Sequence, residues 1–420
     1  MNKNIKLAVA GAVLALSASA NAGIIIPAGD WTLDIGGNVN TFATWTKVSG
    51  DRVTGLGGVT SRDTGATDNG AAHQSNMTTG LLPNYLSVSG STRQNDLDVA
   101  FTISINPGSS TLKSGRQSAQ QENRQAFLTF GDKSWGSIKL GKDIGIAYSD
   151  AILNDMTLLG VGSGAGALAG NTTTLGRIGT GFIYADWKAQ MAYTTPNMSG
   201  FQATVGLTQA FDAHNALTNG TSSTYAVVTT LKGSASGNRG AGNQFAYEGK
   251  ASYSFSANDV TGKVWVSGIS QKLKGLTSNS GALGDVSAFG ADIGANINMG
   301  GFGLTGYYGA GEGMGTTVQF RDGVDLNGRK RDNRDYYVQA TYVLPTKTKL
   351  GLSYGESELR ANAGDVVFTD KYQNSMATAG LYHPLTKHLN LVAEYSHVES
   401  EVDAAKGKSK TGSLGAILFF

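Results

Sequence analysis

The chain of 420 residues contains no cysteine and only six prolines. The absence of cysteine excludes a disulfide framework and a thiolate metal site. After residue 22 no apolar run reaches the roughly 18 to 20 residues that a transmembrane helix needs, which excludes a helical membrane protein. The chain also lacks an excess of charge of one sign. Without Lys3 and Lys6 the basic residues number 31 instead of 33, which equals the 31 acidic residues. A nucleic-acid partner is therefore not expected.

The N-terminal residues have the organisation of a secretory signal peptide. Lys3 and Lys6 precede an apolar run from Leu7 to Leu16, and Ala20-Asn21-Ala22 supplies small residues for cleavage. The apolar run is too short to cross a bilayer as a helix. Residues 1–22 are therefore predicted to be a signal peptide that is removed, and residues 23–420 are predicted to form the exported domain.

Apolar and polar residues alternate along most of that domain. Near its start, Trp31, Leu33 and Ile35 share one parity, while Thr32 and Asp34 share the other. About sixteen such segments follow one another, joined by connections that are alternately short and long, and the last one ends at the C-terminal phenylalanine. A period of two places the two kinds of side chain on opposite faces of a strand, and only a closed barrel satisfies every backbone group of such strands in lipid.

The predicted fold class is therefore all-β: a transmembrane antiparallel β-barrel of about sixteen strands, with short periplasmic turns and long extracellular loops, in the outer membrane of a Gram-negative bacterium. The parity opposite to the apolar one carries charges of both signs and is expected to face the lumen. A barrel of this size is too wide to be filled by its own wall, which predicts a water-filled channel; a plugged lumen is the alternative. The charged residues on this parity are Asp34, Asp98, Asp186, Lys188, Glu248, Lys250, Asp292, Asp335 and Glu394.

One long connection, residues 142–181, differs from the others. It begins with an apolar stretch that includes Ile144, Ile152 and Leu158, whereas the other connections are rich in polar residues and glycine. Apolar side chains left in water would lose the free energy of burial. This segment is therefore predicted to fold inward against the barrel wall and to narrow the channel.

Three motifs around this segment resemble the general trimeric porins of Gram-negative bacteria. They run from Asn123 to Phe127, from Trp135 to Lys142 and from Tyr148 to Met156, and they are similar to the fourth strand, the fifth strand and the eyelet loop of that family. The resemblance implies a homotrimer in outer-membrane lipid that lets small hydrophilic solutes and ions diffuse passively. It implies neither catalysis nor a cofactor.

The resemblance also implies which residues line the constriction. Arg124 and Arg177 match two basic wall positions of the family, and Asp155 matches one acidic loop position, but the second acidic position is occupied by Leu159. Ion selectivity is therefore expected to be weak. An alternative reading is that the two arginines form ion pairs that only hold the loop in place. The predicted pore constriction comprises Arg124, Lys139, Asp150, Asp155 and Arg177.

Other functions find less support in the sequence. An outer-membrane enzyme would need a nucleophile supported by histidine, and the five histidines form no recognisable constellation. A substrate-selective channel or an adhesin stays open as an alternative. Asp322, Asp325 and Asn327 could offer oxygens to a cation, but their spacing misses the EF-hand pattern and neighbouring basic residues would neutralise them. We expect a solvated charge cluster there and no required metal or cofactor.

Overall fold

The alternating segments pair with their neighbours in sequence to form one antiparallel ring. The computed structural model describes residues 23–51, 53, 73–110, 121–164, 173–213, 244–274, 276–278 and 281–420. The predicted signal peptide lies outside the described residues. Within them, sixteen strands make the barrel, which confirms the predicted fold class.

The barrel strands are joined in the order of the sequence, and each pairs with the next. Their bounds are β2 (Trp31–Gly50), β4 (Tyr85–Gln94), β5 (Leu97–Pro107), β7 (Ala126–Asp132), β8 (Gly136–Ile144), β9 (Trp187–Thr194), β10 (Phe201–Gln209), β11 (Phe245–Ala257), β12 (Val260–Leu273), β15 (Val286–Met299), β16 (Phe302–Glu312), β17 (Asp332–Val343), β18 (Lys349–Arg360), β19 (Lys371–Pro384), β20 (Leu389–Val402) and β21 (Ala405–Phe419).

Short elements complete the described chain. They are β1 (Ile24–Ala28), β3 (His73–Thr78), β6 (Gln121–Glu122), β13 (Thr277–Ser278), β14 (Gly281–Ala282), the helix α1 (Ser149–Leu153) and the 3₁₀ helix η3 (Met156–Leu159). In the part of the chain that the structure describes, neither helix has the length and apolarity needed to cross a membrane.

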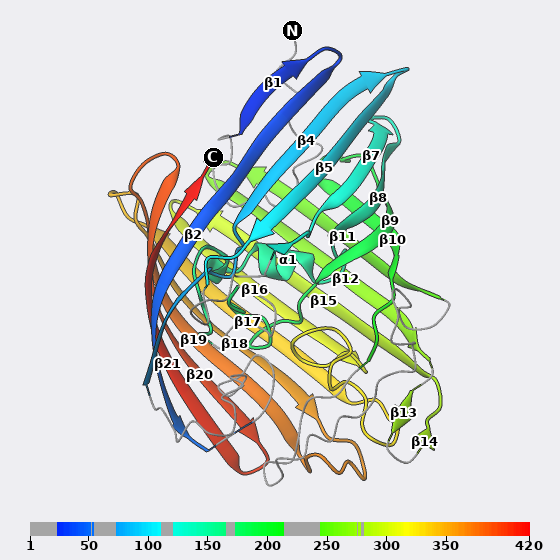
Figure 1. The fold of residues 1–420 in the computed structure, drawn as a ribbon, viewed down its shortest axis with the longest axis vertical. Helices are drawn as coiled ribbons and strands as arrows, with labels where there is room; N and C mark the ends of the chain where they lie inside the picture. Colours follow the sequence, from blue (N-terminus) through cyan, green and yellow to red (C-terminus); the bar gives the residue numbers. More distant parts are fainter. Residues whose placement is uncertain are drawn as a thin grey trace.

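The ring closes where the last strand meets the first. β21 pairs with β2 from Phe419 opposite Asn38 to Gly407 opposite Gly50. The Gly37 N–H donates to the Phe420 carbonyl over 2.7 Å, and the Phe420 N–H donates back over 3.0 Å. β1 continues along the same edge of β2, beyond the C-terminus of β21. The start of the described chain at Gly23 and the C-terminus therefore lie at one end of the barrel, the end that also carries the short turns (Figure 1).

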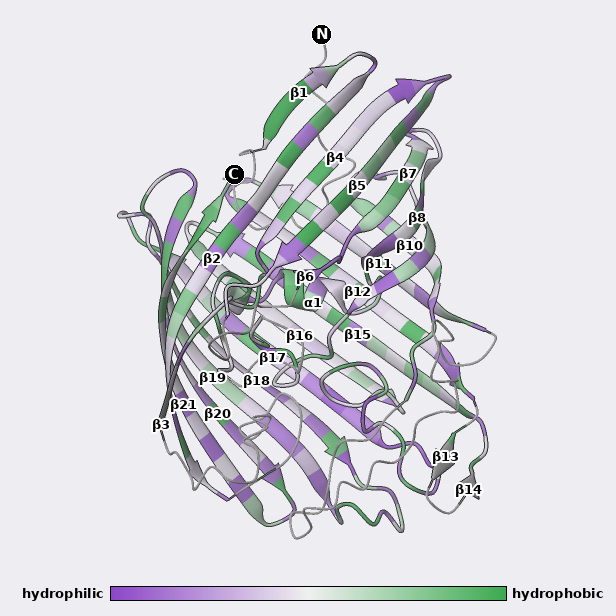
Figure 2. Ribbon diagram, viewed as in Figure 1, coloured by the Kyte–Doolittle hydropathy of each residue, from purple (hydrophilic) through white to green (hydrophobic). Residues whose placement is uncertain are grey.

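The two faces of the wall differ as the alternation predicts. Large apolar side chains project outward along the middle of the strands, and Figure 2 shows hydrophobic and hydrophilic residues alternating along each strand. Exposed aliphatic side chains in an aqueous protein would lose the free energy of burial, whereas in a bilayer they contact acyl chains. Representative members of this outer apolar band are Val39, Ile103, Val205, Ile293, Leu352 and Leu414.

The turns at the end near the termini are tight. Asn95 and Asp96 join β4 to β5 with φ values of 46° and 63°, the left-handed pair that a two-residue hairpin turn requires. The connections at the opposite end are long with one exception. The exception joins β20 to β21, whose pairing extends to Val402 opposite Ala405 and leaves a turn of two residues, 403–404. The sequence predicts a longer loop at this place.

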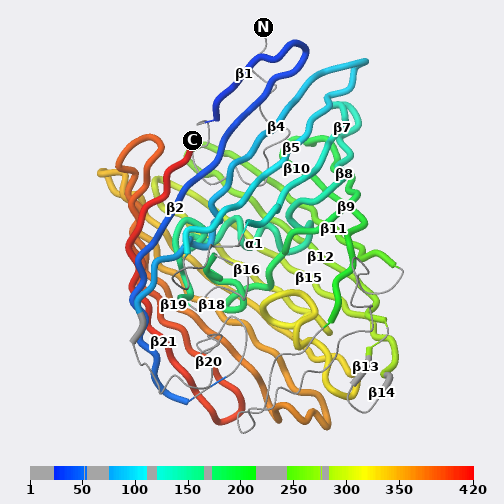
Figure 3. Tube along the Cα trace, viewed as in Figure 1, coloured from blue at the N-terminus to red at the C-terminus, as the bar shows by residue number. Residues whose placement is uncertain are grey.

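Described residues of several connections reach into the lumen, and two connections supply most of the apolar side chains there. The connection between β8 and β9, residues 145–186, is called the inner loop; its described residues, 145–164 and 173–186, carry α1 and η3 and run inside the ring (Figure 3). Residues 313–331, between β16 and β17, also enter, and the Tyr184 N–H donates to the Thr317 carbonyl over 2.8 Å. Inward folding of the first connection is predicted from its sequence, whereas inward folding of the second is not.

The prediction of a solvated charge cluster in the β16–β17 connection is wrong. Asp322 and Asp325 are 5% and 1% exposed, and the Asp325 carboxylate accepts the N–H groups of Asn327 and Arg329 over 2.8 and 2.7 Å. Arg331 is fully buried. Its guanidinium pairs with both carboxylate oxygens of Asp365 in the next connection. The charges are thus matched inside the fold, a pairing that linear spacing does not reveal.

The outer band generates a first prediction. Ile293 lies at the middle of β15, projects outward with 56% exposure and has Val266 and Tyr308 as cross-strand neighbours. Arginine at this position should lower the free energy of unfolding from lipid bilayers by roughly 2–4 kcal/mol, because it places a charge in hydrocarbon. Urea-induced unfolding from vesicles measures this. The control is Thr346→Arg in an exposed turn, expected within about 0.5 kcal/mol of wild type; equal effects of both variants would contradict the lipid-facing assignment.

Candidate functional site in the barrel lumen

A buried glutamate of the wall holds the start of the inner loop. Glu248 on β11 is 4% exposed, and its Oε2 accepts the N–H groups of Ile146 and Ala147 over 2.8 and 2.9 Å. Its Oε1 accepts hydrogen bonds from Lys188 over 2.6 Å and from Thr208 over 2.8 Å. The charge is therefore paired, and two consecutive N–H groups that no strand partner satisfies gain an acceptor.

Ion pairs hold the helix α1 against the barrel wall. The Asp150 carboxylate pairs with Lys263 on β12 and, over 3.3 Å, with Lys250 on β11. Burial opposes ionisation of Asp150, but the two lysines outweigh it and keep the pKa of this carboxyl below its usual range. Before the helix, the Tyr148 N–H donates to the Ser267 hydroxyl over 2.9 Å. Asp150 thus fixes the helix to the wall rather than facing an arginine.

Two side chains of β17 hold the middle of the loop. The Tyr337 hydroxyl donates to the Ala151 carbonyl over 2.9 Å. The Gln339 amide accepts the Met156 N–H over 2.6 Å and donates to the Asn154 carbonyl over 3.1 Å. Both functions of one amide are therefore used between α1 and η3, which fixes the path of the backbone between these helices.

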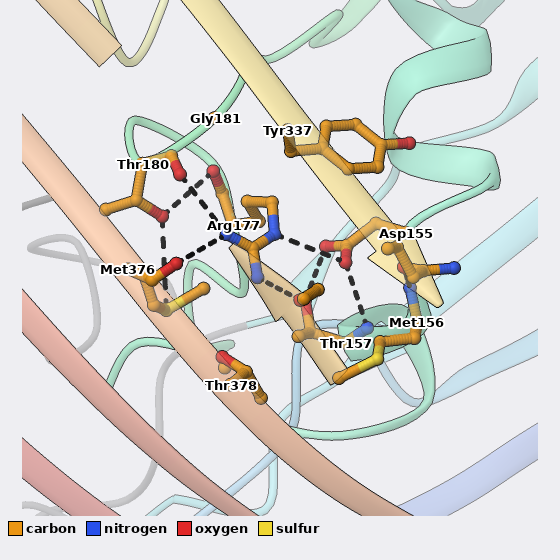
Figure 4. Close-up of polar contacts among 12 residues, drawn as sticks. Asp155, Met156, Thr157, Arg177, Thr180, Gly181, Tyr337, Met376 and Thr378 are labelled. Carbon is orange, nitrogen blue, oxygen red and sulfur yellow. Dashed lines mark hydrogen bonds and ion pairs between the residues drawn. The ribbon is translucent and has the colours of Figure 1, made fainter. Parts of the chain in front are cut away.

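Asp155 and Arg177 meet in the interior of the loop (Figure 4). Both side chains are fully buried, and the Arg177 Nε lies 3.8 Å from the Asp155 Oδ1, close enough for an ion pair but too far for a hydrogen bond. Arg177 also donates to the Met376 carbonyl over 3.0 Å and to the Ser353 hydroxyl. Asp155 caps η3 by accepting the Thr157 N–H over 3.1 Å.

Burial dominates the protonation of this pair. It raises the pKa of Asp155 and lowers that of Arg177, and the attraction between the two opposes both shifts only in part. The guanidinium stays charged because its ordinary pKa is above 12. With no exposed surface, the pair closes the loop on itself and ties it to β18 and β19 rather than presenting charge to solvent.

A second wall glutamate holds the tip of the loop. Glu394 on β20 is 5% exposed, and its Oε2 accepts the N–H groups of Val161 and Gly162, each over 2.8 Å. The Tyr382 hydroxyl donates to its Oε1 over 2.6 Å. Glu394 repeats the arrangement of Glu248 about fifteen residues further along the loop, since both accept two consecutive N–H groups.

Apolar packing supplements these polar contacts. The inner loop and the β16–β17 connection bury their apolar side chains against aromatic residues of the inner wall on β12, β16 and β17. The cluster includes Tyr148, Ile152, Leu158, Ile178, Phe182, Ile183, Trp265, Tyr307, Met314, Phe320 and Tyr337. The apolar start of the loop is thus explained: its side chains form a core inside the barrel.

Two basic residues, the partly exposed Lys139 and the buried Arg124, lie on the other side of the ring. Lys139 on β8 keeps 30% of its side-chain exposure and pairs with Asp143 on the same strand. Arg124 precedes β7, donates to Glu122 over 2.7 Å and lies over the Trp187 ring at 5.8 Å. Among the described residues, Arg124 forms no ion pair with the acidic residues of the inner loop.

The structure therefore separates the five predicted constriction residues. Asp155 and Arg177 are brought together, Asp150 pairs with two wall lysines, and Lys139 and Arg124 pair locally on the opposite wall. The loop-holding residues Glu248 and Glu394 are recognisable in the sequence as lumen-facing charges, but nothing in it shows that they accept backbone N–H groups. Gln339 and Lys263 also lie on the inward-facing parity, and nothing else in the sequence indicates that they hold the inner loop.

Comparisons with known proteins bear on this geometry. A sequence model described as Gram-negative porin matches residues 7–403. Among curated protein sequences, none is significantly similar to this chain.

Solved structures share the fold at low sequence identity. The outer membrane channel DcaP of Acinetobacter baumannii aligns with a TM-score of 0.63 and 15% identity, over 94% of this chain and 99% of its own. Salmonella typhi OmpF, in a complex with daunomycin, gives 0.56 and 14% over 94% and 100%. A trimer form of OmpT from Vibrio cholerae gives 0.50 and 13% over 93% and 99%. At these identities the likeness shows the fold alone.

The tip of the inner loop generates a second prediction. Glu394→Ala removes the acceptor of two buried N–H groups, which should lower the free energy of unfolding by roughly 2 kcal/mol or more. The released tip should also increase current noise in single-channel recordings. The control is Glu399→Gln, on the same strand but facing outward, which should leave both quantities near wild type. A quiet current from the folded Glu394→Ala protein would show that this contact does not hold the loop.

The pairing of Asp150 generates a pH prediction. Because its folded-state pKa is depressed, its stabilising contribution is complete above the unfolded pKa of about 4 and is lost as pH falls through the lower folded value. Asp150→Asn should therefore flatten the loss of thermal stability of the wild type in this acidic window. Asp370→Asn, in an exposed connection, is the control and should keep the wild-type profile. Parallel profiles for wild type and Asp150→Asn would contradict the assignment.

Proposed function

Since the chain belongs to the Gram-negative porin family, we propose that small hydrophilic solutes and ions pass through its lumen with weak ion selectivity. The protein is an outer-membrane porin that forms a passive diffusion channel. The observation that supports weak selectivity is the pairing of charge: the lumen carries basic and acidic side chains, and Lys139, Arg124 and Asp150 each have a partner of opposite sign. Paired charges create a weaker field for a passing ion than a ring of one sign.

We assign the constriction to the space between the inner loop and the wall formed by β4 to β9. Lys139 and Arg124 stand on the wall side, and Asp150, Asp155 and Arg177 set the position of the loop on the other. Lumen-facing serines on β4, such as Ser89, and Asp34 on β2 are partly or fully exposed, which favours a wet passage along this wall. Rings of charge bias permeation without catalysing a reaction, in keeping with a channel family.

We also propose that the protein is a homotrimer. On β21 and β2, the outward-facing Leu414, Val39 and Trp45 are 58%, 55% and 54% exposed in a single chain, and on the inner face Ile417 is buried. A neighbouring subunit or lipid must cover this outward face. The trimer form of Vibrio cholerae OmpT, a protein of the same fold, favours the neighbouring subunit.

A substrate-selective channel is the second candidate, and one observation favours it. Two connections, the inner loop and residues 313–331, occupy the lumen and pair with each other through Tyr184. Both narrow the passage, and a narrower passage discriminates more strongly among solutes. Solute-exclusion measurements in vesicles separate the two functions, since a general pore admits unrelated solutes according to size alone.

Planar-bilayer recording tests the proposed function. The purified folded protein should give stepwise conductance increases, and their complete absence would disprove the channel. Lys139→Glu should shift the reversal potential in a salt gradient toward cations, because it replaces a positive charge on the proposed constriction by a negative one. The control is Lys410→Glu, which makes the same change on the outward face of β21. If the reversal potential of Lys139→Glu equals that of the control, the constriction assignment is wrong while the channel stands.

A further inference from the structure

Two carboxylates behind the inner loop lack a basic partner. Asp292 on β15 and Asp335 on β17 face the lumen and are 6% and 1% exposed. Within the described residues, no lysine or arginine lies within ion-pair distance of either carboxylate, and Lys250, in the same cross-strand row, is engaged by Asp150. A buried carboxylate without a countercharge costs several kcal/mol, so these two need a compensating group.

Strand register places the two aspartates on either side of a glycine. Asp292 stands opposite Gly309 on β16, and Gly309 stands opposite Asp335 on β17. Gly309 has no side chain to fill the space between them, and a methyl group added there would lie 2.6 Å from the Tyr307 hydroxyl oxygen. The Tyr307 hydroxyl therefore lies above the glycine, between the strands that carry the two carboxylates.

A pair of facing glycines extends the floor formed by Gly309. Gly290 stands opposite Gly311, one cross-strand row away, and Gly311 stands opposite Asn333. A methyl group at Gly290 would collide with the Tyr148 hydroxyl of the inner loop, and one at Gly311 would lie 3.0 Å from the Asn333 side-chain oxygen. The three glycines thus form a floor without side chains of its own, and oxygen atoms, the Met314 side chain and the inner loop lie above it.

The oxygens around this floor are unsatisfied. Among the described residues, the following buried atoms accept or donate no hydrogen bond of ordinary geometry: both carboxylate oxygens of Asp292, Oδ1 of Asp335, Oδ1 of Asn333 and the hydroxyls of Tyr148 and Tyr307. Ser267 lies beside Asp292 and Ser357 lies beside Asp335, and neither neighbour carries a positive charge. The Asn333 amide nitrogen donates to the other Asp335 oxygen over 2.8 Å, which fixes the orientation of its own oxygen. Unsatisfied buried polar atoms are rare in folded proteins, and here they are grouped in one place.

We propose that this glycine-floored cradle binds one Ca²⁺ ion. The candidate ligands are all oxygen atoms, which suit a hard cation, and Ca²⁺ takes six to eight oxygens in flexible geometry, whereas Mg²⁺ demands a near-ideal octahedron. The two carboxylates supply two negative charges that the ion neutralises. Because Tyr148 belongs to the inner loop and the other donors belong to the wall, bound Ca²⁺ fastens the start of the loop to β15 and β17.

Calcium titration of the purified barrel tests this proposal. Folded protein in detergent, freed of lipopolysaccharide and treated with a chelator, should bind one Ca²⁺ per chain in isothermal titration calorimetry. Asp335→Asn and Asp292→Asn should each weaken this affinity by roughly tenfold or more, since ligand charge sets affinity. The control is Asp34→Asn, an exposed carboxylate on β2, which should bind as wild type does. Wild-type protein without saturable binding, or binding that both variants retain, would overturn the site.

A thermal measurement keeps the test independent of how well the variants fold. Ca²⁺ that binds only the folded state should raise the unfolding midpoint of the wild type and of Asp34→Asn. It should leave the midpoints of Asp292→Asn and Asp335→Asn unchanged, and in chelator these variants should be at least as stable as the wild type because each loses an unpaired buried charge. An unfolding midpoint of the wild type that does not change when Ca²⁺ is added contradicts the proposal. Bilayer conductance in calcium-free buffer is a separate readout, so failure of this site leaves the channel untouched.

Discussion

Every N–H and C=O group of a strand in lipid must be paired within the protein, because hydrocarbon offers no hydrogen-bonding partner. An open sheet would leave two edges unpaired, so the chain brings β21 against β2 and extends the pairing to Gly37 and Phe420 at the very end of the sequence. This closure places β1 and the C-terminus at one end of the barrel and assigns each residue parity to lipid or lumen.

Closure also creates the problem that the inner loop solves. A ring of sixteen strands encloses more space than the wall side chains fill, and the inner loop and residues 313–331 occupy part of it. Loops inside a polar lumen have backbone groups that no strand satisfies. Glu248 and Glu394 meet this need in the same way, since Glu248 accepts two consecutive N–H groups at the start of the loop and Glu394 accepts two near its middle.

Charge in the lumen thus serves two purposes. Asp150, Asp155 and Arg177 are buried and act on the position of the loop, while Lys139 on the opposite wall stays partly exposed to the passage. Asp292 and Asp335 belong to neither group, since no basic residue of the described chain pairs with them, and this imbalance motivates the calcium site. A diffusion channel needs its narrowest part held at a constant width, which explains why so many lumenal charges act on the loop.

The sequence by itself determined the barrel, because a period of two and the absence of a long apolar run leave a closed sheet as the only membrane fold. It also indicated that the inner loop turns inward, since apolar residues such as Ile152 and Leu158 have no place in water. The partners of the charged residues were decided by the tertiary structure. Asp155 meets Arg177 and Arg331 meets Asp365 only because loop paths and strand register bring them together, and neither can be derived from parity. Parity tells which face a side chain occupies, while its neighbours across the lumen depend on how the ring closes.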